Sequence, residues 1–289
     1  MKNFTFLLPV YDDWTNLKLL LENIDKEISN LHHNFDVIIL NDFSKIKHEF
    51  KNEVYKKFNK IKIIHFNRNL GSQRAIAIGL KYISQNYENT NVIIMDADGQ
   101  DDPSILAKII SYTLESQEDI ITINRSQRNE GLWFRILYEC HYYSLILFSG
   151  YRIRFGNYSL INSNKIKQLT ENGNLWAAYP AAIISTFKKT KKIFHIRKKR
   201  FSGNTKMNFF KLLKHSIRVF SVFKIKVLLS SLVMSVVLYM LGYFFNSILA
   251  FPIFFLIIGN CIIFIASLEN KKKYLDNFTQ VIESEENIK

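Results

Sequence analysis

The first half of the chain alternates short apolar runs with longer segments whose apolar residues recur at helical spacing. In the segment 14–28, for example, apolar residues recur every three or four positions, which is the period of one helix face. Strands that alternate with helices favour a parallel α/β sheet covered by helices on both faces. The pattern predicts strands over 4–10, 36–40, 61–66, 91–95 and 119–124, and helices over 14–28, 49–58, 71–87 and 104–114.

Beyond residue 125 the pattern is less regular. An aromatic-rich helix is expected over 131–149, then a short strand over 158–161 and a helix near 165–170. Basic residues alternate with apolar ones over 209–223, which is typical of an amphipathic helix lying in a membrane interface. The polar end of the chain, 274–289, is expected to be helical at first and frayed beyond.

Two uncharged runs near the end of the chain are long enough to cross a bilayer. They cover 227–245 and 248–268, which are 19 and 21 residues, and a spanning helix needs about 20. Only Asn246 and Ser247 separate them, so we expect a helical hairpin. Basic residues flank both outer ends, which places both termini in the cytoplasm by the positive-inside rule. The alternative is a buried pair of helices in a soluble core.

The charge distribution supports a membrane surface as a partner. The net charge is +14, and fourteen Lys and Arg without any Asp or Glu lie between Lys188 and Lys226. Such a block could bind nucleic acid, but the apolar runs that follow account for it, and no nucleic-acid recognition module is evident. The apolar start is of strand length and ends at Pro9, so no signal peptide is expected. The two cysteines lie far apart, which fits a reduced compartment.

Two acids one residue apart, Asp96 and Asp98, directly follow the strand expected over 91–95. Adjacent carboxylates repel unless a positive charge lies between them. Mg²⁺ or Mn²⁺ bound by one or two carboxylates usually completes its shell with substrate phosphates. The alternative is an acidic helix start, in which Asp101 and Asp102 only complement the helix dipole. Ligands bind beyond the carboxyl ends of parallel strands, where further polar residues also lie: Asp12, Asp13, Asp42, Asn67 and Arg68.

Five motifs occur in order along the chain: PVYDD at 9–13, NDFS at 41–44, NRNLGSQ at 67–73, DADGQDDP at 96–103 and RFSGNTKM at 200–207. With the hairpin, they resemble the family 2 glycosyltransferases of the GT-A fold. The resemblance is strongest to the dolichyl-phosphate mannose synthase and polyprenyl-phosphate glycosyltransferase branch, and it covers nearly the whole chain. It implies a Rossmann-like GT-A nucleotide-sugar domain over 1–206, an amphipathic juxtamembrane helix over 207–226, two transmembrane helices over 227–268 and a cytoplasmic tail over 269–289.

The resemblance also implies roles for individual residues. Asp98, Arg200 and Lys206 would serve catalysis, with the two basic residues neutralising phosphate oxygens of donor or acceptor. Attraction of these two to anionic lipid is the alternative. Asp96, Asp98 and Gln100 would bind Mg²⁺ or Mn²⁺. The residues expected against a UDP- or GDP-sugar donor are Pro9, Tyr11, Asp13, Asp42, Asn69, Gln73, Asp96, Ala97 and Asp98. For Asp12 or Asp13, a helix N-cap is the plainer interpretation.

Three departures from the branch affect the interpretation. Asn41 replaces an acid and Phe43 a glycine, so we expect the 41–44 loop to be shaped differently. Asn157 and Ser159 stand where the branch has Asp and Arg. Asn157 cannot act as a general base, which a hydroxyl acceptor would need. A phosphate monoester is already largely ionised near neutral pH, so it can attack a sugar without one.

The expected function is metal-dependent, inverting transfer of a hexose-like sugar from a nucleotide diphosphate to an undecaprenyl- or dolichyl-type phosphate. Transfer would take place at the cytoplasmic face of the inner membrane, with membrane lipid as a further partner. One alternative is a glycosyltransferase of the same fold that acts on a hydroxyl of lipopolysaccharide, capsule or another glycan. Another is a non-catalytic membrane adaptor. The sugar, the nucleotide and homo-oligomerisation stay open.

Overall fold

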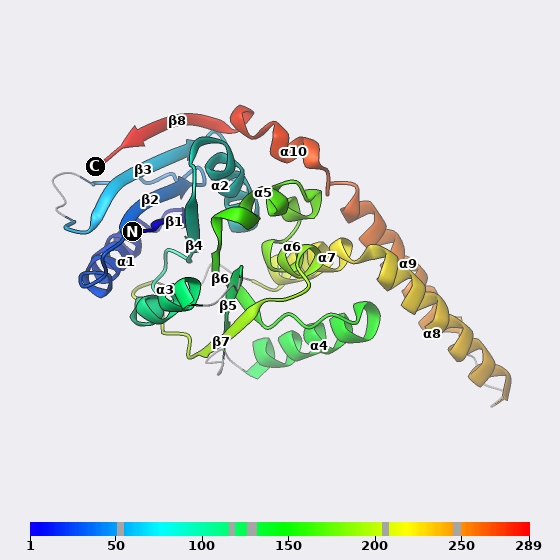
Figure 1. Ribbon diagram of the computed structural model, residues 1–289. Coiled ribbons are helices and arrows are strands. Elements are labelled where there is room, and N and C mark those ends of the chain that lie inside the picture. The colour runs from blue at the N-terminus through cyan, green and yellow to red at the C-terminus, as the bar shows by residue number, and fades with distance from the viewer. Residues whose placement is uncertain (51–54, 116–118, 126–131, 204–207, 245–249) are drawn as a thin grey trace.

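One eight-stranded sheet organises the computed structural model, which describes residues 1–50, 55–115, 119–125, 132–203, 208–244 and 250–289 (Figure 1). The strand order is β7-β5-β6-β4-β1-β2-β3-β8. Apolar, β-branched and aromatic residues fill the central strands, as expected of strands buried on both faces. The strands are β1 (Asn3–Val10), β2 (Asn34–Asn41), β3 (Phe58–Phe66), β4 (Thr90–Ile94), β5 (Ile120–Arg125), β6 (Phe155–Ile161), β7 (Lys191–His195) and β8 (Ile282–Asn287).

The sheet is mixed, so the parallel pairing expected from the alternation of strands and helices holds for part of it. β1 pairs in parallel with β2 and β4, and β2 with β3. β6 inserts between β4 and β5 and is antiparallel to both, while β8 is antiparallel to β3. An apolar run predicts that a strand is buried, but it does not predict whether the strand is parallel or antiparallel to its neighbours. The parallel strands still direct their carboxyl ends to one edge of the sheet, where the motifs of the first half lie.

Helices cover the sheet on both faces, with one apolar core on each. Phe6 and Leu8 of β1 belong to the core beneath α1 and α3, whereas Leu7 between them belongs to the core beneath α2. This alternation is the two-residue period of a strand. The helices of the sheet domain are α1 (Trp14–Glu27), α2 (Ser72–Asn86), η1 (Pro103–Ile105), α3 (Leu106–Glu115), α4 (Leu132–Ser149), α5 (Ser163–Thr170), η2 (Gly173–Trp176) and α6 (Tyr179–Thr186).

Most predicted elements are confirmed to within a few residues, with one exception before β3. Residues 49–50 and 55–57 are not helical and Phe58 already begins β3, so the helix expected over 49–58 is absent from the described residues of that segment. Residues 51–54 lie outside the description. Helix α6 and strand β7 were not predicted, because one is short and alanine-rich and the other carries basic residues at alternate faces.

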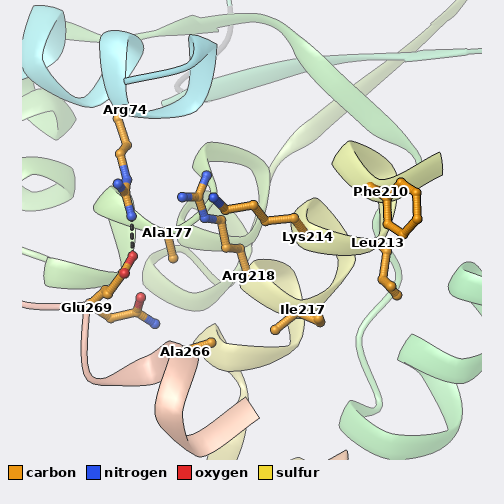
Figure 2. Close-up of a pocket in the computed structure, with 10 residues that line it drawn as sticks. Arg74, Ala177, Phe210, Leu213, Lys214, Ile217, Arg218, Ala266 and Glu269 are labelled. Carbon is orange, nitrogen blue, oxygen red and sulfur yellow. Dashed lines mark hydrogen bonds and ion pairs between the residues drawn. The ribbon is translucent and has the colours of Figure 1, made fainter. Parts of the chain in front are cut away.

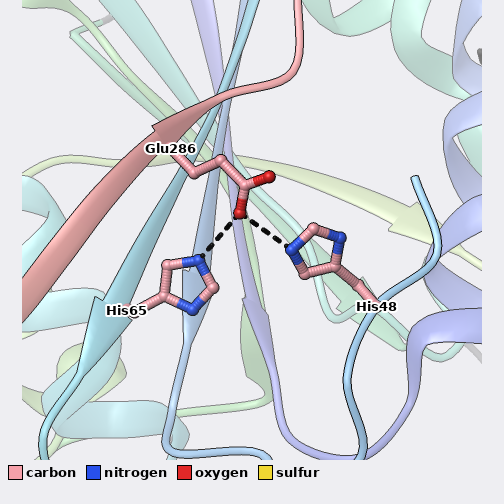
Figure 3. Close-up of side chains that lie close together, drawn as sticks. All are labelled: His48, His65 and Glu286. Carbon is pink, nitrogen blue, oxygen red and sulfur yellow. Dashed lines mark hydrogen bonds and ion pairs between the residues drawn. The ribbon is translucent and has the colours of Figure 1, made fainter. Parts of the chain in front are cut away.

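The end of the chain returns to the sheet. It forms α10 (Lys272–Asp276), η3 (Phe278–Gln280) and then β8, so the helical start is confirmed and the frayed end was wrong. Glu286 of β8 accepts hydrogen bonds from Nε2 of His48, at 2.9 Å, and of His65, at 3.3 Å (Figure 3). Lys62 of β3 also pairs with Glu285. These contacts fix the polar strand along β3.

Helices α7 (Phe209–Val222), α8 (Lys224–Phe244) and α9 (Ala250–Ser267) follow the sheet domain, and α8 and α9 extend away from it (Figure 1). Two segments, Lys224–Tyr243 and Pro252–Asp276, are long and apolar enough to cross a membrane. Only 11% and 6% of their most apolar windows are buried. That exposure does not match the alternative of a helix pair buried in a soluble core.

Candidate functional site

Asp96 and Asp98 lie just beyond the carboxyl end of β4, where the sequence places them. Asp96 accepts a hydrogen bond from Nδ2 of Asn157 at 2.8 Å, and its other oxygen is 3.4 Å from the Arg197 guanidinium. Asp98 accepts from the main-chain N–H of Gln100 at 3.0 Å and lies 3.3 Å from Arg200. Burial, and then repulsion by Asp96, raise the pKa of Asp98. The pair is therefore a focus of negative charge that requires cations.

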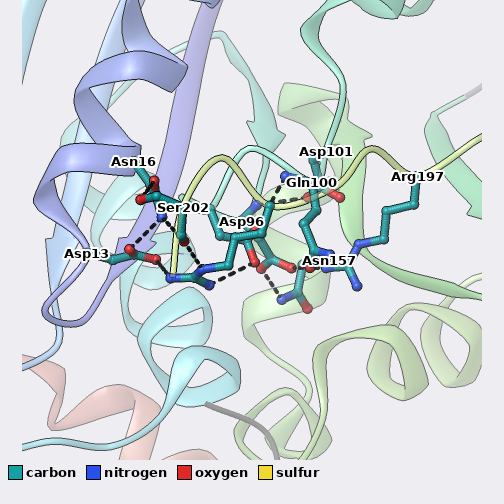
Figure 4. A network of polar contacts seen from close by, with 10 residues as sticks. Asp13, Asn16, Asp96, Gln100, Asp101, Asn157, Arg197 and Ser202 are labelled. Carbon is teal, nitrogen blue, oxygen red and sulfur yellow. Dashed lines mark hydrogen bonds and ion pairs between the residues drawn. The ribbon is translucent and has the colours of Figure 1, made fainter. Parts of the chain in front are cut away.

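Arginines of the segment after β7 supply that positive charge (Figure 4). The Arg200 guanidinium bridges Asp98 and Asp13, and Arg197 approaches Asp96. Main-chain bonds place the segment over the motif, since Phe201 N–H donates to the Asp98 carbonyl at 3.2 Å. The basic segment and the first and fourth strand ends thus converge on one point.

Asp13 takes part in this network rather than capping α1. It is the N-cap residue but makes no side-chain capping hydrogen bond. Its carboxylate accepts instead from Nδ2 of Asn16, at 2.8 Å, and from Arg200. Asn16 also donates to the Ser202 carbonyl at 3.1 Å and accepts from the Ser202 hydroxyl at 2.7 Å. Asn16 and Ser202 were not predicted as site residues, because 186 positions separate them in sequence.

Asn157 positions Asp96 through a directional relay. The main-chain N–H of Tyr179, at the start of α6, donates to Oε1 of Gln73 at 2.9 Å. Gln73 Nε2 donates to Oδ1 of Asn157 at 2.8 Å, and Asn157 donates onward to Asp96. Asn157 is buried. Its amide can accept from Gln73 and donate to a carboxylate at once, and it does so without taking up or releasing a proton.

Asp42 holds the turn that opens α2. Its two carboxylate oxygens accept the main-chain N–H groups of Leu70, at 2.7 Å, and Gly71, at 2.8 Å. Asn69 donates to the Asp42 carbonyl at 3.0 Å. Gly71 has φ +85°, a conformation that glycine adopts at little cost. Burial raises the pKa of Asp42 to about 6, against the lowering effect of these bonds. Asp42 and Asn69 thus shape the wall of the site.

Asp101 and Asp102 are structural parts of the same loop. Asp102 accepts from Ser104 N–H at 2.9 Å, so the interpretation as a helix start holds for it. Burial alone would raise the pKa of Asp102, but hydrogen bonds from Lys198, Ser104 and His195 lower it to about 2. Asp101 is buried and accepts the Asp96 N–H at 2.8 Å. Burial and repulsion by Asp96 raise its pKa to about 7.

The remaining predicted residues differ in how much the structure says of them. Pro9 and Ala97 are buried beside the motif, and Tyr11 is half-buried after β1. The main-chain groups of Gln100 bond to Asp98 and to Lys198, and a metal-binding role for its side chain stays a prediction. Lys206 lies outside the described residues.

Phe43, where the branch has a glycine, has φ +62° and is 48% exposed. This left-handed conformation is uncommon for a bulky residue. The chain therefore keeps, at Phe43, a backbone conformation that glycine favours. Asn41 holds the loop instead of an acid: its side chain accepts from Ser44 N–H at 2.9 Å and lies 2.9 Å from Nδ1 of His65.

A family model described as Glycosyl transferase family 2 matches residues 5–194, which include these strand ends and most of the sheet. The chain belongs to glycosyl transferase family 2. A relative from Synechocystis, described as an uncharacterized glycosyltransferase, is 28% identical over 216 residues, 72% of this chain and 65% of that protein. An undecaprenyl-phosphate 4-deoxy-4-formamido-L-arabinose transferase of Aeromonas hydrophila is 25% identical over 140 residues, 47% of this chain and 40% of that protein. The chain thus matches less than two thirds of each relative's length.

Solved structures place this family 2 member in the GT-A fold. Glucosyl-3-phosphoglycerate synthase from Mycobacterium tuberculosis, in complex with Mn²⁺, UDP-glucose and phosphoglyceric acid, superposes with a TM-score of 0.57. The match covers 78% of this chain and 80% of that one, at 12% identity. At that identity the likeness concerns the fold alone.

The residues present fit a divalent metal ion. Asp96 and Asp98 offer carboxylate oxygens, which hard cations prefer, and phosphate oxygens would complete the shell. Arg197 and Arg200 balance these carboxylates in the structure, so the site already needs positive charge at this point. A metal bound by the two acids would stabilise the charge that develops on a departing diphosphate.

Proposed function

We propose that this family 2 member transfers a hexose-like sugar from a nucleotide diphosphate to polyprenyl phosphate at a membrane surface, with inversion. The convergence of Asp13, Asp98 and Arg200 carries the proposal. It brings two acids and a basic side chain together beyond the strand ends, which supports a donor diphosphate site there. The relatives named as undecaprenyl-phosphate transferases and the two apolar helices support the lipid acceptor.

We assign a change of partner to Arg197 and Arg200, the arginines of the basic segment after β7: they bind the carboxylates first and the donor diphosphate afterwards. Arg200 and Arg197 pair with the acids in the structure, and a metal bound by Asp96 and Asp98 would supply positive charge to the same carboxylates. The guanidinium groups then become available for diphosphate oxygens, which they bind in a bidentate fashion. Charge that develops on the leaving diphosphate would then meet guanidinium donors from the same segment.

The state of the carboxylates favours a phosphate acceptor over a hydroxyl. In the described network, Asp13 and Asp98 are paired with Arg200, and Asp96 with Asn157 and Arg197. A hydroxyl acceptor needs a general base, and a carboxylate that binds a metal or a guanidinium is a weaker one. A lipid phosphate is itself the nucleophile, so it needs no such residue.

The test is a transfer assay with the full-length protein in lipid nanodiscs. Nucleotide sugars are screened with undecaprenyl phosphate and, separately, with glycan hydroxyl acceptors, each with and without Mn²⁺. We expect metal-dependent transfer to the lipid phosphate and its loss in Asp98→Asn. Asp119→Asn is the matched control, because Asp119 precedes β5 at the opposite edge of the sheet and pairs there with Lys165.

Three outcomes would overturn parts of the proposal. Full activity of Asp98→Asn at an unchanged melting temperature would remove the metal-binding role of Asp98. Transfer to glycan hydroxyls alone would show that the acceptor is a glycan hydroxyl and not a lipid phosphate. Absence of nucleotide-diphosphate binding in calorimetry would favour the non-catalytic adaptor.

A further inference from the structure

A separate pocket of about 240 Å³ lies where the sheet domain meets the apolar helices. Four segments form it: the first turn of α2, Ala177 between η2 and α6, much of α7, and the end of α9 with the residues that follow it (Figure 2). It is smaller than the roughly 300–1,000 Å³ typical of sites for drug-sized ligands. The pocket therefore suits a small head group rather than a nucleotide sugar.

Three basic side chains and one acid line the pocket: Arg74, Lys214, Arg218 and Glu269. Arg74 pairs with Glu269, which leaves a local excess of two positive charges. Repulsion by Arg74 and, above all, burial lower the pKa of Arg218, although Glu269 opposes the effect. His215, which neighbours these groups on α7, adds no charge near pH 7, because burial lowers its pKa to about 4. Crowded, partly buried cations of this kind are stabilised by an anion.

Arg74 is held ready for such an anion. Its guanidinium lies 5.0 Å from the centre of the Trp176 ring, which stacks on Tyr274 at 5.5 Å. Its Nε is buried and has no hydrogen-bond partner among the described residues. A guanidinium fixed on an aromatic face loses little side-chain freedom when its other N–H groups bind a phosphate.

Apart from Asn270, the rest of the lining is apolar. Phe210, Leu213 and Ile217 lie along α7, and Ala266 lies at the end of α9. Phe210 is 77% exposed and Leu213 47% exposed. An apolar strip thus runs from the basic group along α7 toward the start of that helix, so a hydrocarbon chain can follow a phosphate bound at the arginines.

We propose that this pocket binds the phosphate of a membrane lipid, with the lipid chain lying along α7. Arg74 and Arg218 bind the phosphate oxygens, and Glu269 competes with the phosphate for Arg74. Both a prenyl phosphate and an anionic glycerolipid offer this chemistry. The inference rests on the membrane placement of α8 and α9 in the proposed function, but it does not depend on sugar transfer.

The experiment measures binding by calorimetry to the full-length protein in uncharged detergent. The probes are farnesyl phosphate, dioctanoyl phosphatidic acid, farnesol and inorganic phosphate. We expect both lipid phosphates to bind, and the alcohol and the free ion to bind much more weakly. Loss of one charge-assisted hydrogen bond is worth about tenfold in affinity, so Arg218→Gln and Arg74→Gln should each weaken lipid-phosphate binding by about that factor.

Two further variants separate binding from general effects. Glu269→Gln should strengthen binding, because it frees Arg74, and a merely structural role predicts no gain. Lys273→Gln removes an equal charge from an exposed position outside the pocket, and the affinity of this variant for lipid phosphate should equal that of the parent.

The outcomes distinguish the two lipid sources. Tighter binding of farnesyl phosphate would identify the pocket as the site of the prenyl-phosphate acceptor. Equal binding of both lipids would identify it as a general site for lipid phosphate head groups. Failure of both lipids to bind, or unchanged binding in both Arg218→Gln and Glu269→Gln, would refute the pocket. Phosphatidic acid binding without any sugar transfer would leave the pocket standing and reject only the transfer reaction.

Discussion

Asn157→Asp tests the relay that positions Asp96. The substitution keeps the shape of the side chain but replaces the donor that now lies 2.8 Å from Asp96 by a carboxylate oxygen. Two carboxylates about 4 Å apart repel by about 4 kcal/mol at an effective dielectric constant of about 20. The lost charge-assisted hydrogen bond adds about 1.5–3 kcal/mol. Because the two acids can share a proton, the full repulsion does not develop. We therefore expect the free energy of unfolding of Asn157→Asp to be lower than that of the parent by about 3 kcal/mol at neutral pH.

The loss should depend on pH and on metal. The pair holds a proton in the folded state that the unfolded chain releases, so stability is regained toward pH 5 and falls as pH rises. For a domain of this size, about 3 kcal/mol corresponds to roughly 6–12 °C in melting temperature. Circular dichroism melts at pH 5 and 7.5 measure this, and Mn²⁺ should stabilise the variant more than the parent. Asn157→Ala is the control, because it removes the bonds without adding charge. Equal melting of Asn157→Asp and parent at both pH values would refute the relay.

Two other substitutions test the loop around Asp98. Gly99 has φ +81°, and a Cβ there would lie 2.2 Å from the Phe201 ring; Gly99→Ala should therefore cost about 1–2 kcal/mol and displace the basic segment. The melting temperature of Gly99→Ala should fall. Its affinity for Mn²⁺, measured by titration calorimetry, should rise, because the displaced segment carries the arginines that pair with Asp96 and Asp98. No change in either quantity would contradict the contact between Gly99 and Phe201. Asp101, with a pKa raised from 3.8 to about 7, keeps a proton that the unfolded chain loses, so stability falls as pH rises through that window. Asp101→Asn keeps an acceptor for the Asp96 N–H and should flatten melting temperature between pH 5 and 8; an unaltered profile would assign the dependence elsewhere.

Sequence periodicity predicted the central sheet because burial there is nearly complete. Phe6, Leu8 and Ile39 have no exposed surface, and such strands reveal themselves as apolar runs. β8 could not be predicted in the same way. It reads IESEEN, and an edge strand with charged, exposed side chains carries no apolar alternation. Its position depends on partners in β3 more than 200 residues earlier in the chain.

The candidate site was predicted as a set of strand ends but not as a network. Asp96, Asp98 and Asp13 follow strands, so a pattern of strands places them at one edge. The partners that organise them come from distant segments, as Arg197 and Asn157 do, and no local pattern records those pairings. From the sequence, Asn157 was considered as a residue that cannot act as a general base, and not as a residue that positions Asp96. One signal could have identified this positioning role: an amide takes the place of an acid next to a pair of carboxylates.

The return of the chain to β3 has a consequence for how the protein matures. The sheet domain cannot be completed until synthesis has passed through α8 and α9, because β8 follows both helices in the chain. Until then β3 is an open edge, with unpaired main-chain groups that attract other strands. His48 and His65 close that edge through their hydrogen bonds to Glu286. Completion of the sheet domain therefore requires that the apolar hairpin has been made and that the chain after it has returned to β3.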